Sequence, residues 1–439
     1  MLFRQFVDED LGCASYLIGD EASGDAVVVD PAYAIEPYLE EAERAGVRIV
    51  RVLETHTHAD HVSGHGRLAL DHGVPVSIHP AAEPEYPFEP VEDGEELLVG
   101  EVPIRVLHTP GHRPEHCCFL VDGRLLTGDS LLIGDAARAD LAIEARAGAA
   151  ELYHSLHRLA ELPDDTSVYP GHVAGSLCAT GISEARSSTI VLERLSNRAL
   201  RFPELQEFVA DAASVSAPRP PTLERVVALN RGPFVAAPPP LKPLTSFEGQ
   251  VLDVRSARQF AAGHVAGAMN VPVGGSSFGT RAAFLLDPDA AVALHASSPA
   301  EAELAARRLQ AVGILDLAGY LVDAAARERL EPITLDELER LLAYDAVEVI
   351  DVREKDERDS GYIPGSRHIP YRLVRAYRDE LDNGRPVVTV CGSGTRAAIA
   401  ASVLAAEGVG ARPLLDAGVA DWEKRGHALT AFRRCGGSA

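Results

Sequence analysis

The sequence has 439 residues, more than the roughly 250–300 that a single hydrophobic core usually serves, so we expect two or three domains. Its formal net charge of -24, from 65 acidic and 41 basic residues, argues against nucleic-acid or anionic-membrane partners. The six cysteines are dispersed and form no C-x-x-C pair, which excludes a dense disulfide framework. Neither a signal-like start nor a membrane-length apolar run occurs, and we expect a cytoplasmic protein.

Apolar periodicity predicts a mixed α/β first domain. Residues 36–45 (EPYLEEAERA) read as an amphipathic helix, with Pro37 in its first turn and Gly46 at its end. Further helices are expected over 149–160 and 183–212. The expected strands are 14–18, 26–29, 48–53, 74–78, 102–107, 118–121 and 124–127.

A proline-rich stretch follows this domain. Residues 214–242 contain several proline clusters, which predict a stiff connector and not a packed element. We therefore assign residues 1–242 to the first domain, with 214–242 as its connector.

An internal repeat with an offset of 98 residues occupies the rest of the chain. Asp253-Val254-Arg255 matches Asp351-Val352-Arg353, and residues 263–272 match residues 361–370. Each copy continues as apolar strand, short loop and alanine-rich helix, which is typical of a parallel α/β sheet. The repeat predicts two related small domains, at 243–330 and 331–439.

Ligand-type side chains follow directly after the strand at 48–53. The segment Thr55-His56-Thr57-His58-Ala59-Asp60-His61 holds three imidazoles and a carboxylate, the groups that borderline divalent metals prefer. A solvated histidine-rich turn is the competing interpretation, but few structural needs call for this set. Three more candidates each follow a glycine at the end of a later strand: His112, Asp129 and His172.

In this order, H-x-H-x-D-H, P-G-H, T-G-D and P-G-H resemble the metallo-β-lactamase superfamily over residues 1 to about 235. The resemblance implies an αββα sandwich with the metal at one edge. It also implies seven ligand positions: His56, His58, Asp60, His61, His112, Asp129 and His172.

Two members of that superfamily look most similar. Glyoxalase II is a two-metal thioester hydrolase. The persulfide dioxygenase binds one Fe(II) through two histidines and an aspartate, which here are His56, His112 and Asp129. Such a triad leaves three positions open for substrate sulfur and O₂. His58, Asp60, His61 and His172 are then second-shell residues or ligands of a second metal ion, and the ligand count does not choose between one iron and two zincs.

Two further features resemble the dioxygenase. The segment from Thr127 to Ile133 continues to Arg138 and Asp140, which are candidates for binding a thiol carrier, although a surface ion pair explains them equally well. Cys178, six residues after His172, is a candidate to relay sulfur; a small buried apolar residue is the alternative interpretation.

A second candidate site begins at Cys391, which follows an apolar strand and precedes an alanine-rich helix. Backbone N–H groups at a helix N-terminus stabilise a thiolate, and Arg396 adds a charge able to hold an oxoanion. The alternative interpretation is a buried structural cysteine, but such a cysteine requires neither the glycines of this loop nor Arg396. The loop between the thiol and Arg396 consists of Gly392, Ser393, Gly394 and Thr395.

This loop resembles that of rhodanese sulfurtransferases, and the resemblance covers about 331–435. The first repeat departs from it. Aligning Gly313 with Gly408 places Ala296 opposite Cys391 and Glu301 opposite Arg396, whereas the offset of 98 gives Ala293 and Ser298. Either alignment predicts that residues 243–330 form a catalytically inactive rhodanese-like domain.

Together, the resemblances imply that Fe(II), one per chain, oxidises a thiol persulfide with O₂ to sulfite. Cys391 then transfers sulfane sulfur to sulfite, giving thiosulfate, and tethering the two sites favours this step. A two-zinc thioester hydrolase and a non-catalytic sulfur carrier or sensor are the alternatives, and a nuclease fits least. We also expect a homo-oligomer, while the carrier thiol stays open among glutathione, coenzyme A, bacillithiol and mycothiol.

Overall fold

The computed structural model describes residues 1–139, 144–173, 185–214, 218–325 and 327–431. Contacts divide the chain into two compact units. The first is Met1–Pro239 with Arg307–Leu315, and the second is Pro240–Ala306 with Asp316–Ala439. In the described residues, no helix is both long enough and apolar enough to span a bilayer.

Two six-stranded sheets form the centre of the first unit. One sheet follows chain order: β1 (Leu2–Val7), β2 (Ala14–Asp20), β3 (Asp25–Val29), β4 (Arg48–Leu53), β5 (Val76–Ile78) and β6 (Glu89–Pro90). The other has the order β14 (Ser188–Thr189), β13 (Ser167–Pro170), β10 (Arg124–Gly128), β9 (Cys117–Val121), β8 (Val102–His108) and β7 (Glu96–Val99). A small hairpin, β11 (Leu131–Leu132) and β12 (Asp135–Ala136), follows β10.

The inner faces of these sheets pack into one apolar core. Tyr16 and Val29 of the first sheet and Phe119 and Leu126 of the second are fully or almost fully buried in it. The alternation of inward and outward side chains along each strand explains why the opposite faces need a second covering layer.

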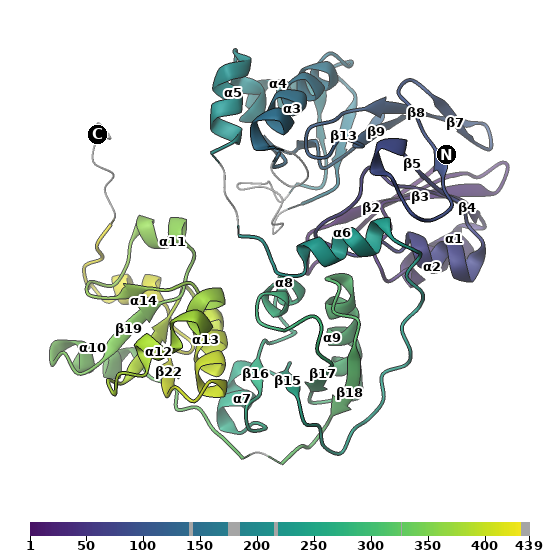
Figure 1. Ribbon diagram of the computed structural model, residues 1–439. Helices are drawn as coiled ribbons and strands as arrows, with labels where there is room; N and C mark the ends of the chain where they lie inside the picture. The colour runs from purple at the N-terminus through teal and green to yellow at the C-terminus, as the bar shows by residue number, and fades with distance from the viewer. Residues whose placement is uncertain (140–143, 174–184, 215–217, 326, 432–439) are drawn as a thin grey trace. The chain divides into compact units, whose positions relative to one another are not determined.

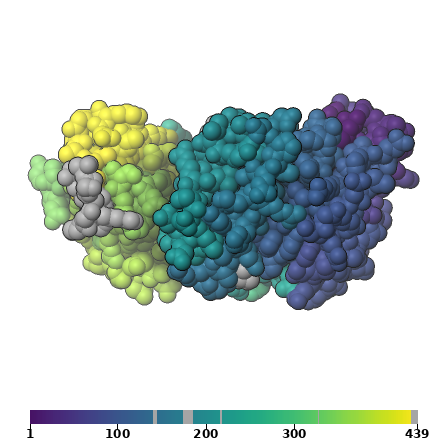
Figure 2. All heavy atoms as spheres, turned by 90° about the horizontal axis from the view of Figure 1, so that it is seen from above, coloured from purple at the N-terminus to yellow at the C-terminus, as the bar shows by residue number. Residues whose placement is uncertain are grey.

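Helices supply that covering layer on both outer faces (Figure 1). The first sheet packs against α1 (Glu36–Ala45) and α2 (His65–His72) through Tyr38 and Leu68. The second packs against α3 (Ala145–Ala160), α4 (Ile190–Ser196) and α5 (Leu205–Ala212). Seen from above, the teal atoms of this second helical layer form the outer surface (Figure 2). The layers are those of the expected αββα sandwich, and the predicted fold class is confirmed.

Two expectations about individual elements were wrong. A continuous helix over 183–212 is not formed within the described residues: α4 ends before Asn197, and the short 3₁₀ turn η2 (Ala199–Arg201) and Pro203 separate it from α5. The connector at 214–242 contains a packed helix, α6 (Leu223–Arg231), although prolines flank it. Val226 of α6 is buried against Tyr33 and Val62, so an apolar face between the prolines outweighed them.

The second unit contains two four-stranded parallel sheets with one strand order. The first is β16 (Met269–Asn270), β15 (Gln250–Asp253), β17 (Val292–His295) and β18 (Leu317–Leu321). The second is β20 (Arg367–His368), β19 (Glu348–Asp351), β21 (Val387–Val390) and β22 (Ala411–Pro413). Their helices and turns are α7 (Ala257–Ala262), α8 (Phe278–Ala283), α9 (Pro299–Ala311), α10 (Leu335–Ala343), α11 (Lys355–Ser360), η3 (Tyr371–Tyr377), α12 (Arg378–Leu381), α13 (Thr395–Ala406) and α14 (Val419–Lys424).

The repeat seen in the sequence is preserved in the strand register. Asp253 pairs with Asn270 in one sheet, and Asp351 pairs with His368, each 98 residues later, in the other. Arg255 donates hydrogen bonds to Asp253 and to the Gly263 carbonyl. Arg353 makes the same two contacts in its own copy, with Asp351 and Gly361.

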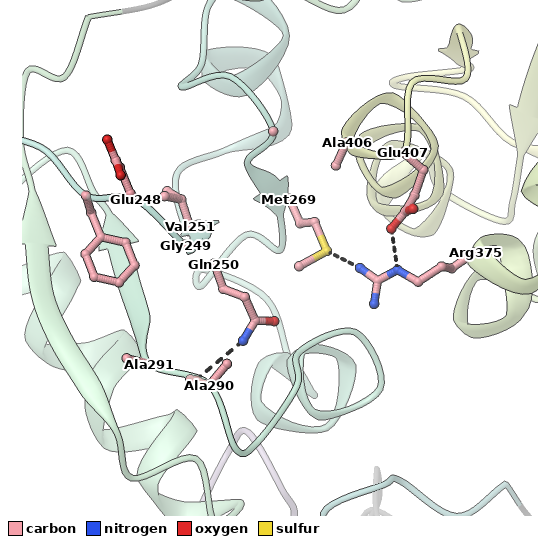
Figure 3. A pocket seen from close by; sticks show the side chains of 12 residues that line it. Glu248, Gly249, Gln250, Val251, Met269, Ala290, Ala291, Arg375, Ala406 and Glu407 are labelled. Carbon is pink, nitrogen blue, oxygen red and sulfur yellow. Dashed lines mark hydrogen bonds and ion pairs between the residues drawn. The ribbon is translucent and has the colours of Figure 1, made fainter.

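The two copies contact each other within the second unit. The Asn270 N–H donates to Ser402 Oγ of α13 at 2.9 Å. Nearby, a cavity of about 500 Å³ includes Gln250, Met269, Arg375 and Glu407 in its lining (Figure 3). Arg375 forms an ion pair with Glu407 of its own copy and donates to Met269 Sδ of the other copy, so the hydrogen bond to Met269 joins the two copies.

We predict that Leu156→Ala destabilises the first unit by about 2–5 kcal/mol, because Leu156 of α3 is fully buried and truncation leaves a cavity. Leu195→Ala, on α4, is the matched control: Leu195 is 73% exposed, so its loss should cost less than about 0.5 kcal/mol. Calorimetric unfolding of both variants measures the difference. Equal effects would contradict the packing described here.

Candidate functional site

Four strand ends bring the ligand-type side chains of the first unit together. β4 leads into the loop with His56, β8 precedes the turn with His112, and β10 and β13 are followed by Asp129 and His172. β10 and β13 are parallel neighbours, so Asp129 and His172 leave the sheet at the same edge. Gly171 makes their approach possible, because a Cβ there would lie 2.8 Å from Asp129 Oδ1.

His56, His112 and Asp129 form one group whose ligand atoms all lie within 4.8 Å of one another. Each of the three is only 1% exposed. Within the described part of the chain, His56 Nε2 and Asp129 Oδ2 have no hydrogen-bond partner. Buried polar atoms are rarely left unpaired, so this pattern fits a bound divalent cation.

Hydrogen bonds orient both imidazoles of this triad. Thr55 Oγ1 donates to Asp30 and lies 2.9 Å from His56 Nδ1, so it accepts that N–H and leaves Nε2 as the ligand atom. His112 Nδ1 donates to the Arg138 carbonyl at 2.8 Å, which likewise frees Nε2. Such partners fix the tautomer and ring orientation of metal ligands.

Asp129 is held from two sides. Its Oδ1 lies 2.6 Å from His172 Nδ1, while its backbone N–H donates to His116 Nε2 at 3.0 Å. Its Oδ2, which has no hydrogen-bond partner among the described residues, is the oxygen left open toward a metal ion. His116 is therefore a positioning residue. It was not among the metal ligands expected from the sequence, and the spacing P-G-H-x-x-x-H was the only sequence feature that pointed to it.

His58 lies in a different group. Its Nε2 is 3.1 Å from Glu54 and 3.3 Å from Asp30, and these three residues form a second cluster of ligand-type atoms. Glu54 also contacts His65 and accepts the Ser63 hydroxyl. Sequence reasoning missed Glu54, because nothing in the motif shows that a residue ahead of the first histidine turns inward to bind His58.

Asn230 of α6 fastens the histidine loop. Its Nδ2 donates to the carbonyls of His58 and His61 at 2.9 and 2.8 Å, and its Oδ1 accepts the Ser63 N–H at 2.8 Å. The helix that was expected to be a connector thus supports the metal-binding loop. No sequence signal distinguishes this asparagine from a surface residue.

Asp60, His61 and His172 meet around a residue that sequence reasoning left out, Cys13. His172 Nε2 lies 2.8 Å from Asp60 Oδ2, and the Cys13 sulfur lies 3.1 Å from the same oxygen. The seven expected ligand positions therefore separate into the triad, His58 with its carboxylates, and this third cluster.

Burial and nearby charge set the protonation of these groups. Burial lowers the pKa of His56 and of His112, which keeps both rings neutral and able to bind a metal. At His58, burial acts in the same direction, but Asp30 and Glu54 outweigh it and raise the pKa. The neutral rings of His56 and His112 are therefore ready to act as metal ligands, whereas His58 is held by its two carboxylates.

Three other residues that the sequence predicted for the site, Arg138, Asp140 and Cys178, have different outcomes. Arg138 lies after β12 and is buried, and the contact it makes to the triad is through its carbonyl to His112. Cys178 and Asp140 lie outside the described residues.

In the second unit, Cys391 stands between β21 and α13. The thiol is fully buried, and the Gly394 N–H donates to its sulfur at 3.1 Å. Gly394 has φ of 92°, which favours glycine and aims this N–H into the loop. The neighbouring loop packs so closely that a Cβ on Gly418 would lie 2.0 Å from the Gly392 carbonyl oxygen.

Arg396 follows in the first turn of α13. Its two terminal nitrogens contact Glu357 of α11 at 2.5 and 2.7 Å. The expected anion-binding arginine is therefore paired with a carboxylate that an oxoanion has to displace. The short spacing between loop and helix predicted the position of Arg396 but not this partner.

The first rhodanese-like copy, which the sequence predicts to be inactive, has the same backbone frame with different side chains at the loop. Asp253 pairs with His295 and Asp351 pairs with Val390, so strand register places Ala296 opposite Cys391. Glu301 then corresponds to Arg396, and its carboxylate accepts the Ser297 N–H at 2.5 Å. The Glu301 carboxylate thus accepts a hydrogen bond from the loop N–H that would otherwise be available to an anionic ligand.

Comparison with known proteins agrees with the division of the chain into a metal-binding domain and two rhodanese-like copies. A model of the metallo-β-lactamase superfamily matches residues 8–172, and a model of the rhodanese-like domain matches residues 241–323 and 334–425. A crystal structure of a metallo-β-lactamase from Staphylococcus aureus subsp. aureus COL has a TM-score of 0.68 at 28% identity. That match covers 73% of this chain and 98% of the other.

Two curated relatives represent different chemistries. Mitochondrial persulfide dioxygenase ETHE1 of Bos taurus is 30% identical over 251 residues, 54% of this chain and 91% of that protein. Hydroxyacylglutathione hydrolase of Maricaulis maris is 34% identical over 180 residues, 39% of this chain and 66% of that protein.

The fold and the buried donor groups define a metal-binding αββα domain that is followed by two rhodanese-like domains. The chain belongs to the metallo-β-lactamase superfamily, as a relative of the persulfide dioxygenases that carries rhodanese-like domains.

We predict that His116 makes the metal-free protein sensitive to mild acid. Burial lowers the pKa of His116 to about 3, whereas an unfolded histidine has a pKa of about 6.5. The unfolded state therefore binds more protons in this range, and stability falls as pH falls below about 6.5. Between pH 7 and 5, the wild type should lose about 2 kcal/mol more than His116→Asn.

Calorimetry at several pH values, after removal of metal by a chelator, measures this difference. His72→Asn is the control, because His72 is exposed and its substitution should leave the pH dependence unchanged. Parallel pH profiles for the wild type and His116→Asn would contradict the assignment.

Proposed function

We propose that this chain is a non-haem Fe(II) persulfide dioxygenase coupled to a rhodanese sulfurtransferase. The observation that carries the proposal is the triad of His56, His112 and Asp129, in which His56 Nε2 and Asp129 Oδ2 are buried with no hydrogen-bond partner among the described residues. Two imidazoles and one carboxylate with open positions are the ligand set of non-haem iron oxygenases. The similarity to persulfide dioxygenases supports the same chemistry.

In this proposal, the metal domain converts a low-molecular-weight thiol persulfide, O₂ and water into the thiol, sulfite and protons. Ferrous iron, one per chain, supplies the redox chemistry that activates oxygen beside the outer sulfur. The residues of the chain hold that iron: Thr55 and the Arg138 carbonyl orient His56 and His112, and His172 fixes Asp129.

The rhodanese-like domain completes the reaction with a second persulfide. The Cys391 thiolate takes the outer sulfur from this persulfide and releases the thiol, and sulfite then takes the sulfur from Cys391 to give thiosulfate. The Gly394 N–H directed at the sulfur supports a thiolate in this position. Displacement of Glu357 from Arg396 makes room for the anion.

A thioester hydrolase with two zinc ions is the competing function, and the similarity to hydroxyacylglutathione hydrolases favours it. Against it, the triad of His56, His112 and Asp129 shares no residue with the other two clusters of ligand-type atoms in the described part of the chain. Metal analysis of anaerobically purified protein separates the two: one iron with persulfide-dependent O₂ uptake, or two zincs with thioester cleavage.

We predict that His112→Ala lowers persulfide-dependent O₂ uptake at least about 100-fold, because it removes one of three iron ligands. Thiosulfate:thiol sulfur transfer by Cys391 should stay within about twofold of the wild type. An oxygen electrode and a sulfurtransferase assay on the same preparation measure both. His72→Ala, an exposed histidine on α2, is the control. Unchanged O₂ uptake in His112→Ala would refute the proposed role of the triad.

We predict that Cys391→Ser shifts the product from thiosulfate to sulfite, because the hydroxyl that replaces the thiol cannot carry sulfur. O₂ uptake should be unchanged, and sulfite should account for most of the oxidised sulfur. Chromatographic quantification of both anions during turnover tests this, with the wild type as reference. Thiosulfate formation at the wild-type rate would mean that another group transfers the sulfur.

A further inference from the structure

A short segment after the third strand of the first rhodanese-like copy belongs, by its contacts, to the metal-binding unit. The segment Arg307–Leu315 is grouped with Met1–Pro239, although the rhodanese-like family model matches residues 241–323 without a break. It contains the end of α9, at Ala311, and the turn at Gly313. Part of a rhodanese-like sequence is therefore built into the unit that carries the triad.

One contact of the Arg307–Leu315 segment is with the loop that carries the first histidines. The Val62 N–H donates to the Ala311 carbonyl at 2.7 Å, and Val62 directly follows His61. Ala311 ends α9, and the last carbonyls of a helix have no partner within the helix. The Val62 side chain is fully buried, and Leu315 packs against its cluster. The helix end and the histidine loop therefore satisfy each other.

A second contact reaches the same loop through α6. Arg225 Nε donates to the Gly313 carbonyl at 3.0 Å. Gly313 lies so near α6 that a Cβ there would be 3.1 Å from Val226 Cγ2 and 3.6 Å from Leu229 Cδ1. The same helix carries Asn230, whose side chain bonds three backbone groups of the histidine loop. The Arg307–Leu315 segment therefore supports the helix that fastens this loop.

An ion pair adds a third contact. Arg308 Nη1 lies 3.5 Å from Asp10 Oδ1, and Asp10 is only 3% exposed. A buried carboxylate is costly unless a nearby charge compensates it. Asp10 lies between β1 and β2, in the loop whose Gly12 carbonyl accepts the Val173 N–H, one residue after His172. The segment therefore also contacts the loop that lies against this histidine.

The histidine loop depends on such outside contacts for its shape. Residues 54–62 form neither helix nor strand, yet all of them except Asp60 are buried. Buried backbone groups outside regular structure have to find their partners elsewhere. Metal ligands act only within a narrow range of positions, which their supporting residues set. Loss of the contacts from Ala311 and α6 therefore loosens the backbone between His56 and His61.

We propose that the Arg307–Leu315 segment is a positioning element of the metal site, so that the first rhodanese-like copy supplies part of the support for the metal-binding loop. The inference goes beyond the proposed function, because it holds for whichever divalent ion the triad binds. It gives this copy a part in metal binding that requires no chemistry at Ala296 or Glu301.

Two matched glycine variants of the full chain test the proposal. Gly313 and Gly408 align in the two copies and have φ of 82° and 83°, so a leucine meets the same backbone strain at either position. At Gly313 a Cβ meets α6, whereas at Gly408 no atom of the described residues beyond its chain neighbours lies within 4 Å of it. Gly313→Leu should therefore displace α6, and Gly408→Leu should leave it in place.

Hydrogen exchange of the metal-free protein measures the loop without any catalysis. In Gly313→Leu, a peptide covering residues 54–63 should exchange at least about fivefold faster than in the wild type, as expected for the loss of one hydrogen bond. Titration with Co²⁺, followed by its visible absorption, should show binding weakened at least about 10-fold. Gly408→Leu should match the wild type in both measurements.

Wild-type exchange or wild-type Co²⁺ affinity in Gly313→Leu would overturn the proposal, and so would equal changes in Gly408→Leu. If Gly313→Leu fails to fold, Leu315→Ala provides the second variant, because it removes packing against the cluster of Val62 and Val226 and leaves both glycines in place. It should accelerate exchange of the same peptide, and an unchanged rate refutes the proposal. Neither measurement uses persulfide or O₂, so a failure of the dioxygenase proposal is recognised independently.

Discussion

The contact between His172 and Asp129 is the constraint on which the chemistry of the metal domain depends. It binds one oxygen of the carboxylate and leaves the other for a metal ion. The contact requires β10 and β13 to be adjacent and parallel, and it requires a glycine at 171, where any Cβ would collide with the carboxylate. Strand order, the absence of a side chain at Gly171 and one hydrogen bond together fix the orientation of the Asp129 carboxylate.

The rhodanese-like pair shows how one fold can carry different chemical groups at the same loop. Both copies keep the strand order, the register and the Arg–Asp pair that closes the first loop. At the end of the third strand, one copy has Cys391 and Arg396, and the other has Ala296 and Glu301. Replacing the cation by a carboxylate reverses the charge of the loop and provides an internal ligand for its N–H.

Much of the fold could be predicted from local sequence. The helix at 36–45 and the strand at 48–53 were predicted with their observed bounds, because their periodicity and end signals are local. The packed helix α6 was not, since its role arises only when Asn230 meets the histidine loop about 170 residues earlier in the chain. Proline content is a local signal and carries no information about such a partner.

The same distinction applies to the candidate site. The motifs name seven candidate ligands but do not show how these divide into groups, because the division depends on contacts with residues such as Glu54 and Cys13, which belong to no motif. Glu54 and Asp30 bind the Nε2 atom of His58, whereas the Nε2 atom of His56 has no hydrogen-bond partner among the residues that the structure describes. Equal burial therefore has opposite results: neighbouring carboxylates raise the pKa of His58, and desolvation lowers that of His56.

The neutral His56 ring offers a free nitrogen to a cation, whereas His58, whose pKa is raised by Asp30 and Glu54, competes poorly for one. The selection of a triad from seven candidates thus follows from where the acidic residues lie. The carboxylates of the first unit therefore determine which imidazole rings are neutral and able to bind a metal ion. Some of these carboxylates also offer ligand atoms of their own. Since these carboxylates are buried beside the histidines, their effect is little screened by solvent.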